Sequence, residues 1–401
     1  MSRPPVLVVG GGLVGAVTAL ALAARGWPVT LVDRARPETT AGDAGALGVD
    51  LRTVALAPDA LALLEAVGAW DPELALAAEA YDAMEVWDAD GTGRIRFEAG
   101  DFGLERLGVI VENRRLLARL WAVLEASGVT LRTGAGAAAL AVDESGVRLT
   151  LEDGAVLQAA LLIGADGGRS RVRALAGIDA ETTDTGQSAV VTAVATERPH
   201  GGTAWQRFLS TGPLAFLPLP DAPDGRHRCS LVWSLDRARA EVMQALDDAG
   251  FVHELERAFE GRLGAITAVD RRVSFPLPQV HARHYRAPGV VLVGDAAHVV
   301  HPLAGQGVNL GLRDVALLVR ELERAASGPA RRLLDVDLLA RYERARRGDN
   351  ALMLASLLGL KRLFGADDPA VRWLRNAGLR FTDRSATIKR RLMAHALGLA
   401  D

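Results

Sequence analysis

A glycine-rich segment near the start of the chain has the residue types and the spacing of a phosphate-binding turn. Residues Gly10-Gly11-Gly12-Leu13-Val14-Gly15 match the pattern G-x-G-x-x-G and directly follow the apolar run Val6-Leu7-Val8-Val9. In this pattern Gly10 permits a tight turn, Gly12 lets the backbone approach a pyrophosphate, and Gly15 brings a helix close to a strand. The N–H groups at the start of that helix then face the anion. The segment predicts a dinucleotide-binding site, and a tight turn without a ligand is the alternative.

The elements that must position this turn are a strand, a helix and a second strand. Residues Leu13 to Arg25 have helical spacing, and Gly26 is a typical helix stop. The β-branched run Val29-Thr30-Leu31-Val32 then ends on Asp33, at the sequence separation where a carboxylate binds a dinucleotide ribose. The region Pro4 to Ala24 is also apolar enough to resemble a signal peptide or membrane anchor. Its order of strand, turn and helix favours the nucleotide site instead.

Two more aspartates follow strand-like runs later in the chain. Asp166 lies in Gly164-Ala165-Asp166-Gly167-Gly168-Arg169-Ser170, and Asp295 lies in Gly294-Asp295-Ala296-Ala297-His298. Taken separately, each segment is also explained as a turn with a capping aspartate. Together, the three segments indicate one binding site that is built from distant parts of the chain.

In this order and at these separations, the three motifs resemble those of the single-component FAD-dependent aromatic hydroxylases. The segment from Gly294 to Asp314 is similar to the signature of the ubiquinone-biosynthesis branch of these enzymes. Further similar segments are Asp50–Leu56, Glu112–Arg114, Gln206–Phe208 with Gly212–Leu214, and Lys389–Met393. The resemblance therefore spans nearly the whole chain.

The resemblance implies an α/β fold with a Rossmann-like FAD-binding domain, an inserted mixed or antiparallel β-sheet substrate domain, and C-terminal helices. Alternating runs between Thr185 and Ser234 also favour antiparallel strands, whereas Gly108 to Val111 returns to the style of the nucleotide domain. The expected FAD-binding domain is discontinuous and comprises residues 1–75, 101–182 and 271–330. The substrate domain comprises residues 76–100 and 183–270, and the C-terminal helical region comprises residues 331–401.

The resemblance also implies a set of residues that bind FAD. They are Gly10, Gly12, Gly15, Asp33, Arg52, Arg114, Asp166, Asp295, Gly305, Gly307, Val308 and Asn309. Asp295 would hold the ribityl chain, and backbone N–H groups from Gly305 to Asn309 would face the flavin edge that becomes negative on reduction. Arg52 and Arg114 have the alternative of a solvated surface position, and Arg115 is a substitute for Arg114. Asp33 stands where many relatives carry glutamate.

The implied activity is that of an FAD-dependent NAD(P)H aromatic hydroxylase, a monooxygenase that holds FAD, uses NAD(P)H as a transient donor and consumes O₂. In this class a C4a-hydroperoxyflavin transfers oxygen to an electron-rich ring. The implied substrate is a polyprenyl phenol of ubiquinone biosynthesis. Pro302, Gly305 and Gln306 would frame the flavin and oxygen pocket, and no side chain is assigned to proton transfer.

Large side chains on the central strands are the candidates for the substrate pocket. Trp205, Phe208, Phe216 and Trp233 suit an apolar substrate, but the same residues suit an ordinary sheet core. The ring position, the prenyl length, the choice of NADH or NADPH and the oligomeric state are not determined by the sequence.

Other functions remain open at this point. One is the same chemistry on a water-soluble phenol or a polyketide-like aromatic. A second is a non-catalytic flavin-binding assembly subunit, which would bind flavin without turnover. A third is a nicotinamide dehydrogenase, which would leave the motifs at Asp166 and Asp295 without a role.

Histidine and cysteine content argues against a metal centre. His298 and His301 stand in the third motif without a neighbouring ligand cluster, so we expect them to pack around the flavin loop rather than bind metal. Cys229 is the only cysteine, which excludes an intramolecular disulfide and a thiolate zinc site.

Charge and hydropathy limit the partners. The 46 basic and 49 acidic residues give a formal net charge of −3, which offers no general attraction to nucleic acid. We expect a cytoplasmic protein with peripheral contact to the inner membrane, and the resemblance implies partners in a ubiquinone-biosynthesis complex. Lys389, Arg390 and Arg391 on an expected helix at 386–399 suit an anionic bilayer, although a capping helix with a solvated basic face is the favoured explanation.

Overall fold

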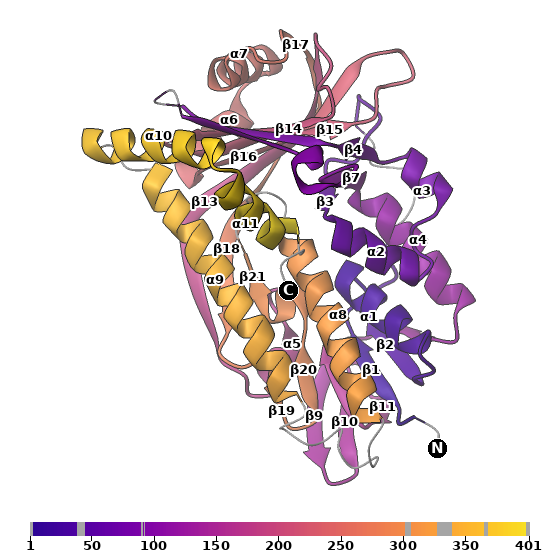
Figure 1. The fold of residues 1–401 in the computed structure, drawn as a ribbon. Coiled ribbons are helices and arrows are strands. Elements are labelled where there is room, and N and C mark those ends of the chain that lie inside the picture. Colours follow the sequence, from indigo (N-terminus) through magenta and orange to yellow (C-terminus); the bar gives the residue numbers. More distant parts are fainter. Residues whose placement is uncertain are drawn as a thin grey trace.

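The computed structural model describes residues 3–37, 45–89, 91, 93–300, 306–326, 339–364 and 368–397. Within these ranges a mainly parallel sheet forms the part of the fold that holds the glycine-rich turn (Figure 1). Its order is β19-β20-β12-β1-β2-β8, and every neighbouring pair from β20 to β8 is parallel. The bounds are β1 Val6–Val9, β2 Val29–Asp33, β8 Thr130–Thr133, β12 Leu161–Gly164, β19 Arg286–Ala287 and β20 Val290–Leu292.

Burial on both faces explains why the central strands β1, β12 and β20 contain only apolar residues and glycine. Every residue of β1 is buried, and helix α1 (Leu13–Ala23) is buried from Gly15 to Leu22. The helix packs against α4 (Asn113–Ala126) and α8 (Gln306–Ala326). The expected strand, turn, helix and second strand at the start of the chain are confirmed.

A second, larger sheet contains the segments expected for substrate binding. It runs in the order β21-β18-β13-β16-β15-β14-β5-β6, with β17 paired to β13. All neighbouring strand pairs of this sheet are antiparallel except β14 with β5, so the sheet is mixed. The bounds are β5 Ala83–Asp88, β6 Arg94–Glu98, β13 Ala180–Thr196, β14 Thr203–Leu209, β15 Gly212–Leu219, β16 His227–Asp236, β17 Ile266–Val269, β18 Val273–Ala282 and β21 His298–Val299.

Two small sheets complete the strands of the described residues. One has the order β3-β7-β4, with β3 Thr53–Leu56, β4 Glu79–Tyr81 and β7 Gly108–Glu112. The other has the order β11-β10-β9, with β9 Ala137–Asp143, β10 Gly146–Leu151 and β11 Val156–Ala159. The strand at β7 therefore pairs antiparallel with β3 and β4 and does not join the parallel sheet.

Helices cover the sheets and carry the chain to its C-terminus. The bounds are α2 Pro58–Ala66, α3 Pro72–Leu76, α5 Arg171–Leu175, α6 Arg237–Ala245, α7 Asp248–Phe259, α9 Ala340–Phe364, α10 Pro369–Arg384 and α11 Ala386–Leu397, with short 3₁₀ turns η1 Ala99–Phe102 and η2 Gly294–Ala296. Helices α9, α10 and α11 lie together on one side of the molecule, drawn in the yellow end of the colour scale in Figure 1. None of the helices in the described ranges is long and apolar enough to cross a bilayer. The mixed α/β fold class is confirmed, and the domain boundaries stay a prediction.

Candidate active site

A cavity of about 610 Å³ opens where the parallel strands β1, β2 and β12 end. We call it the nucleotide cavity, because ligands of open parallel sheets bind outside the carboxyl ends of the strands. Its walls come from all three sequence motifs and from segments between them. The lining residues are Val9, Gly10, Gly12, Leu13, Val14, Val32, Asp33, Arg34, Arg52, Asn113, Leu117, Gly136, Ala137, Ala165, Asp166, Gly167, Arg169, Arg171, Asp295 and Val308.

Each of the three glycines of the first motif is needed for a different structural reason. Gly10 has φ +108°, and a Cβ there would lie 2.3 Å from the Ala165 carbonyl oxygen. A Cβ on Gly15 would lie 1.9 Å from the Gly10 carbonyl oxygen, so this position needs glycine for close packing of helix on turn. A Cβ on Gly12 would meet nothing within 4 Å, and Gly12 lines the cavity. The space beside Gly12 is therefore open, and a pyrophosphate in the cavity can approach the backbone there.

Asp33 lies at the edge of the nucleotide cavity, at the end of β2. Its carboxylate accepts hydrogen bonds from the backbone N–H groups of Gly11 and Ala35. The indole N–H of Trp121 donates to the Gly11 carbonyl oxygen at 2.9 Å and holds the same turn from α4. The carboxylate and the glycine turn are therefore fixed relative to each other.

Asp166 also lines the nucleotide cavity, but its carboxylate has a local structural task. It accepts the N–H groups of Arg171 at 2.7 Å and Val172 at 3.0 Å, and it is bonded to the Ser170 hydroxyl. It thus caps the start of α5, which was the alternative explanation of this motif. Its contact with FAD stays a prediction.

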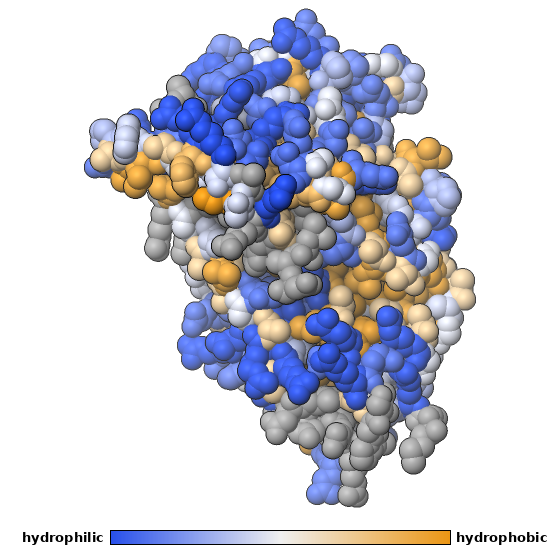
Figure 2. All heavy atoms as spheres, in the orientation of Figure 1, coloured by the Kyte–Doolittle hydropathy of each residue, from blue (hydrophilic) through white to orange (hydrophobic). Residues whose placement is uncertain are grey.

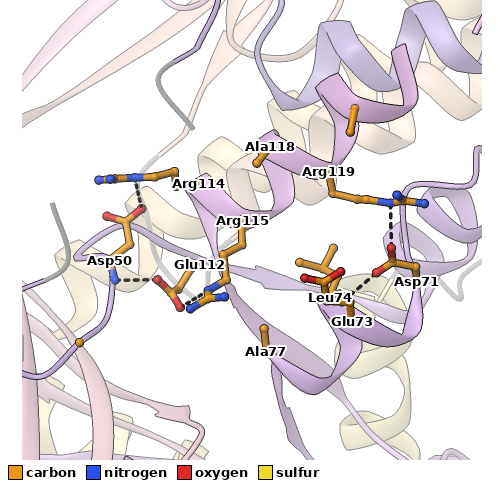
Figure 3. A pocket seen from close by; sticks show the side chains of 12 residues that line it. Asp50, Asp71, Glu73, Leu74, Ala77, Glu112, Arg114, Arg115, Ala118 and Arg119 are labelled. Atoms are coloured by element: carbon orange, nitrogen blue, oxygen red, sulfur yellow. Dashed lines mark hydrogen bonds and ion pairs between the residues drawn. The ribbon is translucent and has the colours of Figure 1, made fainter. Parts of the chain in front are cut away.

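Arg52 lines the nucleotide cavity, whereas Arg114 does not line it. Arg114 lies over Asp50, with 3.8 Å between Nε and Oδ2, and Arg115 pairs with Glu112 at 2.7 Å. Both arginines border a separate cavity of about 410 Å³ between α3 and α4 (Figure 3). Arg114 also lines a cavity of about 230 Å³ that shares Arg52, Asn113 and Leu117 with the nucleotide cavity, so its contact with FAD stays a prediction.

Asn113 and Leu117 line the nucleotide cavity and were not among the expected site residues. They lie four positions apart at the start of α4, so they occupy the same helix face. Asn113 is part of the segment that carried the family resemblance, and its spacing of four from Leu117 is the signal that could have identified it.

A second cavity, of about 310 Å³, meets the nucleotide cavity at Asp295 and Val308, which line both. We call it the apolar cavity. Its lining residues are Thr53, Val54, Ala55, Tyr81, Met84, Ile110, Ala204, Trp205, Gln206, Ala215, Leu217, Val232, Asp295, Val299, Val300, Gln306, Gly307, Val308 and Met393. A molecule held in the nucleotide cavity therefore has access to a largely hydrocarbon-lined space.

Asp295 is the ionisable side chain at this junction. Its side chain is exposed to the two cavities that it lines, and the protein around these cavities raises its pKa by desolvation; Asp314 acts in the same direction and His298 in the opposite one. The motif that carries it is fixed by Asp314, whose carboxylate accepts the Gly294 N–H at 2.9 Å.

The start of α8 contributes Gln306, Gly307 and Val308 to the apolar cavity. The Asn309 side chain instead accepts the Ala57 N–H and donates to the Ala55 carbonyl, each at 2.9 Å. Asn309 therefore ties α8 to the end of β3 through its side chain. The expected site residues Pro302 and Gly305, and also His301, lie outside the described residues.

The aromatic residues expected to line the substrate pocket divide between the two faces of the large sheet. Trp205 is part of the apolar cavity's lining, but it pairs with Phe216 in register and packs with Trp87, at 6.3 Å between ring centroids, on the α7 side of the sheet. Phe208 stacks on Phe364 with 4.0 Å between ring centroids. Phe216 stacks on Phe259 at 3.8 Å, and Trp233 lies in the same core against α7. Placing these last two in the substrate pocket was therefore a mistake.

Strand alternation explains this correction. Ala215 and Leu217 on β15, and Val232 on β16, line the apolar cavity, so their neighbours Phe216 and Trp233 point to the other face. The period of two was visible in the sequence, but it did not say which face meets the nucleotide cavity.

His298 belongs to a buried polar cluster beneath the third motif. Its Nε2 lies 2.6 Å from Asp314 Oδ2, and Arg346 Nε donates to Asp314 Oδ1 at 2.6 Å. All three residues are buried. This placement agrees with the expected packing role of His298, and the described residues contain no group of three or more histidines, cysteines or acids arranged to hold a metal ion.

Replacing Asp295 with alanine should give a colourless protein, because the variant loses the carboxylate at the junction of the two cavities. The measurement is the ratio of visible flavin absorbance to protein absorbance after purification with added FAD. Asp143→Ala, which removes an exposed carboxylate that lines neither cavity, should stay yellow. Full flavin content in Asp295→Ala would contradict the assignment.

Comparison with known proteins agrees with this geometry. The family model described as "FAD binding domain" matches residues 3–354. The chain is 39% identical over 396 residues to 3-demethoxyubiquinol 3-hydroxylase of Escherichia coli, with 98% of each chain covered. It is 39% identical to ubiquinone hydroxylase UbiL of Rhodospirillum rubrum, covering 98% of this chain and 89% of the relative. It is 34% identical to the mouse mitochondrial ubiquinone biosynthesis monooxygenase COQ6, covering 98% and 90%.

Solved structures share the fold. The p-nitrophenol 4-monooxygenase PnpA of Pseudomonas putida superposes with a TM-score of 0.74 at 20% identity, covering 98% of this chain and 96% of that one. PqsL of Pseudomonas aeruginosa, described as a probable FAD-dependent monooxygenase, gives 0.75 at 25% identity, covering 95% and 100%. The glycine cradle, Asp33 and Asp295 are thus set in a fold shared with FAD-dependent enzymes.

Proposed function

This chain belongs to the FAD binding domain family of flavin-dependent monooxygenases, in the branch of the ubiquinone-biosynthesis hydroxylases, and on that premise we propose that it hydroxylates the aromatic ring of a polyprenyl phenol. FAD, NAD(P)H and O₂ are the cofactors and co-substrates of this class. Bound FAD supplies the redox chemistry, which is acceptance of hydride from NAD(P)H and activation of O₂. The chain's own residues supply binding, orientation and exclusion of water.

The observation that carries the proposal is the junction of the two cavities at Asp295 and Val308. The nucleotide cavity offers a glycine turn and carboxylates, which suit the pyrophosphate and ribose of FAD. The apolar cavity offers aliphatic and thioether walls, including Ile110, Leu217 and Met393, which suit a prenylated ring. Dry walls also limit the entry of water, which would divert activated oxygen from the substrate.

The start of α8 supplies the electrostatic component. Gln306, Gly307 and Val308 border the apolar cavity, and the backbone N–H groups at the start of a helix stabilise nearby negative charge. We infer that this helix end faces the part of FAD that becomes negative on reduction. Asp33 would bind the adenosine ribose, and Gly10, Gly12 and Gly15 would lie under the pyrophosphate. Arg52 would contact phosphate or ribityl oxygens.

We also propose where the protein works. A polyprenyl tail keeps the phenol in the bilayer, so the enzyme meets its substrate at the cytoplasmic surface of the inner membrane, with other proteins of a ubiquinone-biosynthesis complex as neighbours. We further propose that the chain is divided into the FAD-binding domain, the substrate domain and the C-terminal helical region at the boundaries expected from the sequence.

Ala215→Phe should lower kcat/KM for a prenylated phenol about 100-fold while leaving the FAD content unchanged, because misplacing the ring by about 1 Å is costly for transfer. Ala215 faces the apolar cavity from β15, and the larger side chain would fill it. The measurement is phenol-dependent NAD(P)H oxidation together with detection of the hydroxylated product. Val242→Phe, at an exposed position of α6, is the matched control.

The same assay tests the function itself. Turnover of the prenylated phenol by the native protein supports the proposal. Turnover of only a water-soluble phenol or a polyketide-like aromatic would contradict the substrate class. Bound flavin that NAD(P)H does not reduce, with or without phenol, would favour a non-catalytic assembly subunit.

A further inference from the structure

Helix α10 carries three large apolar side chains on its outer side. Trp373, Leu374 and Phe381 are 68%, 62% and 66% exposed. With Ala370 and Ala377 they follow helical spacing and share one side of the helix. We call these five residues the α10 face. Figure 2 shows apolar surface gathered where α10 lies in Figure 1.

A buried ion pair fixes this orientation. Arg375 of α10 donates to both carboxylate oxygens of Asp88 on β5, at 2.7 and 2.9 Å, and both residues are 2% exposed. Asn376 also donates to Asp88 at 2.9 Å and accepts the Gly93 N–H at 2.5 Å. A rotation that buried the α10 face would expose this pair and break it, which is costly for desolvated charges. The outward direction of Trp373, Leu374 and Phe381 is therefore built into the fold.

Charge is distributed unevenly around the α10 face. The chain as a whole has a formal charge of −3, yet residues 369–397 contain only one acidic residue, Asp383. The basic residues of the same segment are Arg372, Arg375, Arg380, Arg384, Lys389, Arg390 and Arg391, of which Arg375 is buried against Asp88 and Lys389 pairs with Asp101 and Asp383. Arg380 and Arg384 are exposed on the same helix as the α10 face.

Exposed tryptophan and phenylalanine beside arginine are the composition of a helix that lies in a membrane interface. The apolar side chains enter the boundary of the acyl region, and the arginines meet anionic headgroups. We propose that the α10 face docks this protein on an anionic bilayer surface. The occupant is thus a lipid surface rather than a second copy of the chain.

Helix α10 lies close in the chain to a wall of the apolar cavity, so docking through α10 would serve substrate access. This step rests on the proposed function. Helix α11 begins at Ala386, directly after α10, and its Met393 lines the apolar cavity. Met393 also packs in one cluster with Phe97, Phe208 and Phe364, beneath the C-terminal helices. Docking through α10 therefore brings a wall of the apolar cavity to the surface in which a prenylated phenol is dissolved.

The test is flotation of the native protein with vesicles of phosphatidylcholine alone and of phosphatidylcholine mixed with phosphatidylglycerol. The native protein should float with the mixed vesicles, and binding should weaken as salt is raised. The triple variant Trp373→Ser, Leu374→Ser, Phe381→Ser should bind the mixed vesicles with an affinity at least about tenfold lower, because three apolar groups no longer enter the interface. The matched control Leu76→Ser, Val156→Ser, Val242→Ser removes exposed apolar side chains from α3, β11 and α6 and should bind like the native protein.

Two results would overturn the proposal: no flotation of the native protein with either vesicle, or equal flotation of the triple variant. A native dimer that the triple variant converts to a monomer, without vesicle binding, would assign the α10 face to a second copy. Turnover of a phenol with a short prenyl chain, which does not need the bilayer to reach the enzyme, is measured in parallel and should be the same in both variants. Vesicle binding without turnover would keep the docking site and reject the proposed function, so the two failures are distinguishable.

Discussion

Gly15→Ala should give a protein that is destabilised by about 3 kcal/mol and purifies without FAD, because overpacked interiors cost roughly 1–3 kcal/mol and sometimes more. The added Cβ would lie 1.9 Å from the Gly10 carbonyl oxygen, a backbone atom of the buried turn between β1 and α1. Helix α1 must then move away from β1, and the turn that shapes the nucleotide cavity moves with it. The measurements are urea unfolding and flavin content.

Two other glycines separate folding from binding in this experiment. Gly128→Ala meets nothing within 4 Å and should leave both stability and flavin content unchanged. Gly12→Ala is equally unobstructed, but its methyl group points into the space proposed for the pyrophosphate. This variant should therefore fold normally and bind FAD more weakly. A Gly15→Ala variant of native stability and full flavin content would show that the close packing is not required.

Asp314→Ala should destabilise the protein by about 3–5 kcal/mol, the cost of removing one partner from a buried ion pair. The variant leaves Arg346 buried without this carboxylate and removes the acceptor of the Gly294 N–H and the partner of His298. Because Gly294 precedes Asp295, the flavin site should also be lost. Urea unfolding and flavin content are the measurements.

Asp349→Ala is the matched control, because Asp349 pairs with the same Arg346 at 3.1 Å but is 58% exposed. Its removal should cost no more than about 0.5 kcal/mol, as for other solvent-exposed ion pairs. Equal effects of the two substitutions would contradict the assigned importance of the buried cluster.

The same cluster predicts a pH dependence. Burial alone would raise the pKa of Asp314, but His298 and Arg346 outweigh it and hold the pKa below its ordinary value. A carboxyl group whose pKa is lower in the folded state stabilises the fold above its unfolded pKa, which is about 3.9, and loses that contribution as the pH falls. Native stability should therefore fall on acidification below about pH 4, and Asp314→Asn should remove part of that slope.

The sequence predicted the nucleotide half of the fold and site because its signals are local. The order of strand, turn and helix around Gly10 to Gly15 depends on contacts between near neighbours in the chain. Asp33 is the last residue of β2 and Asp295 lies three residues after the end of β20, so their place at the ends of the parallel strands follows from the length of each strand. Gly108 to Val111 was harder to place, because a short apolar run does not specify its partner, and it pairs antiparallel with β3 and β4.

Only the tertiary structure decided which face of a strand or helix points into the protein and which points into a cavity or outward. Alternation along β15 and β16 fixes that Ala215 and Phe216 point in opposite directions, but the position of α7 decides that Phe216 enters the core and Ala215 the apolar cavity. Arg114 and Asn113 are adjacent in sequence, yet helix geometry directs Asn113 to the nucleotide cavity and Arg114 to Asp50. Likewise, the pairing of Arg375 with Asp88, 287 residues away, turns the α10 face outward. Local periodicity sets relative directions, whereas only long-range packing sets which direction is inside.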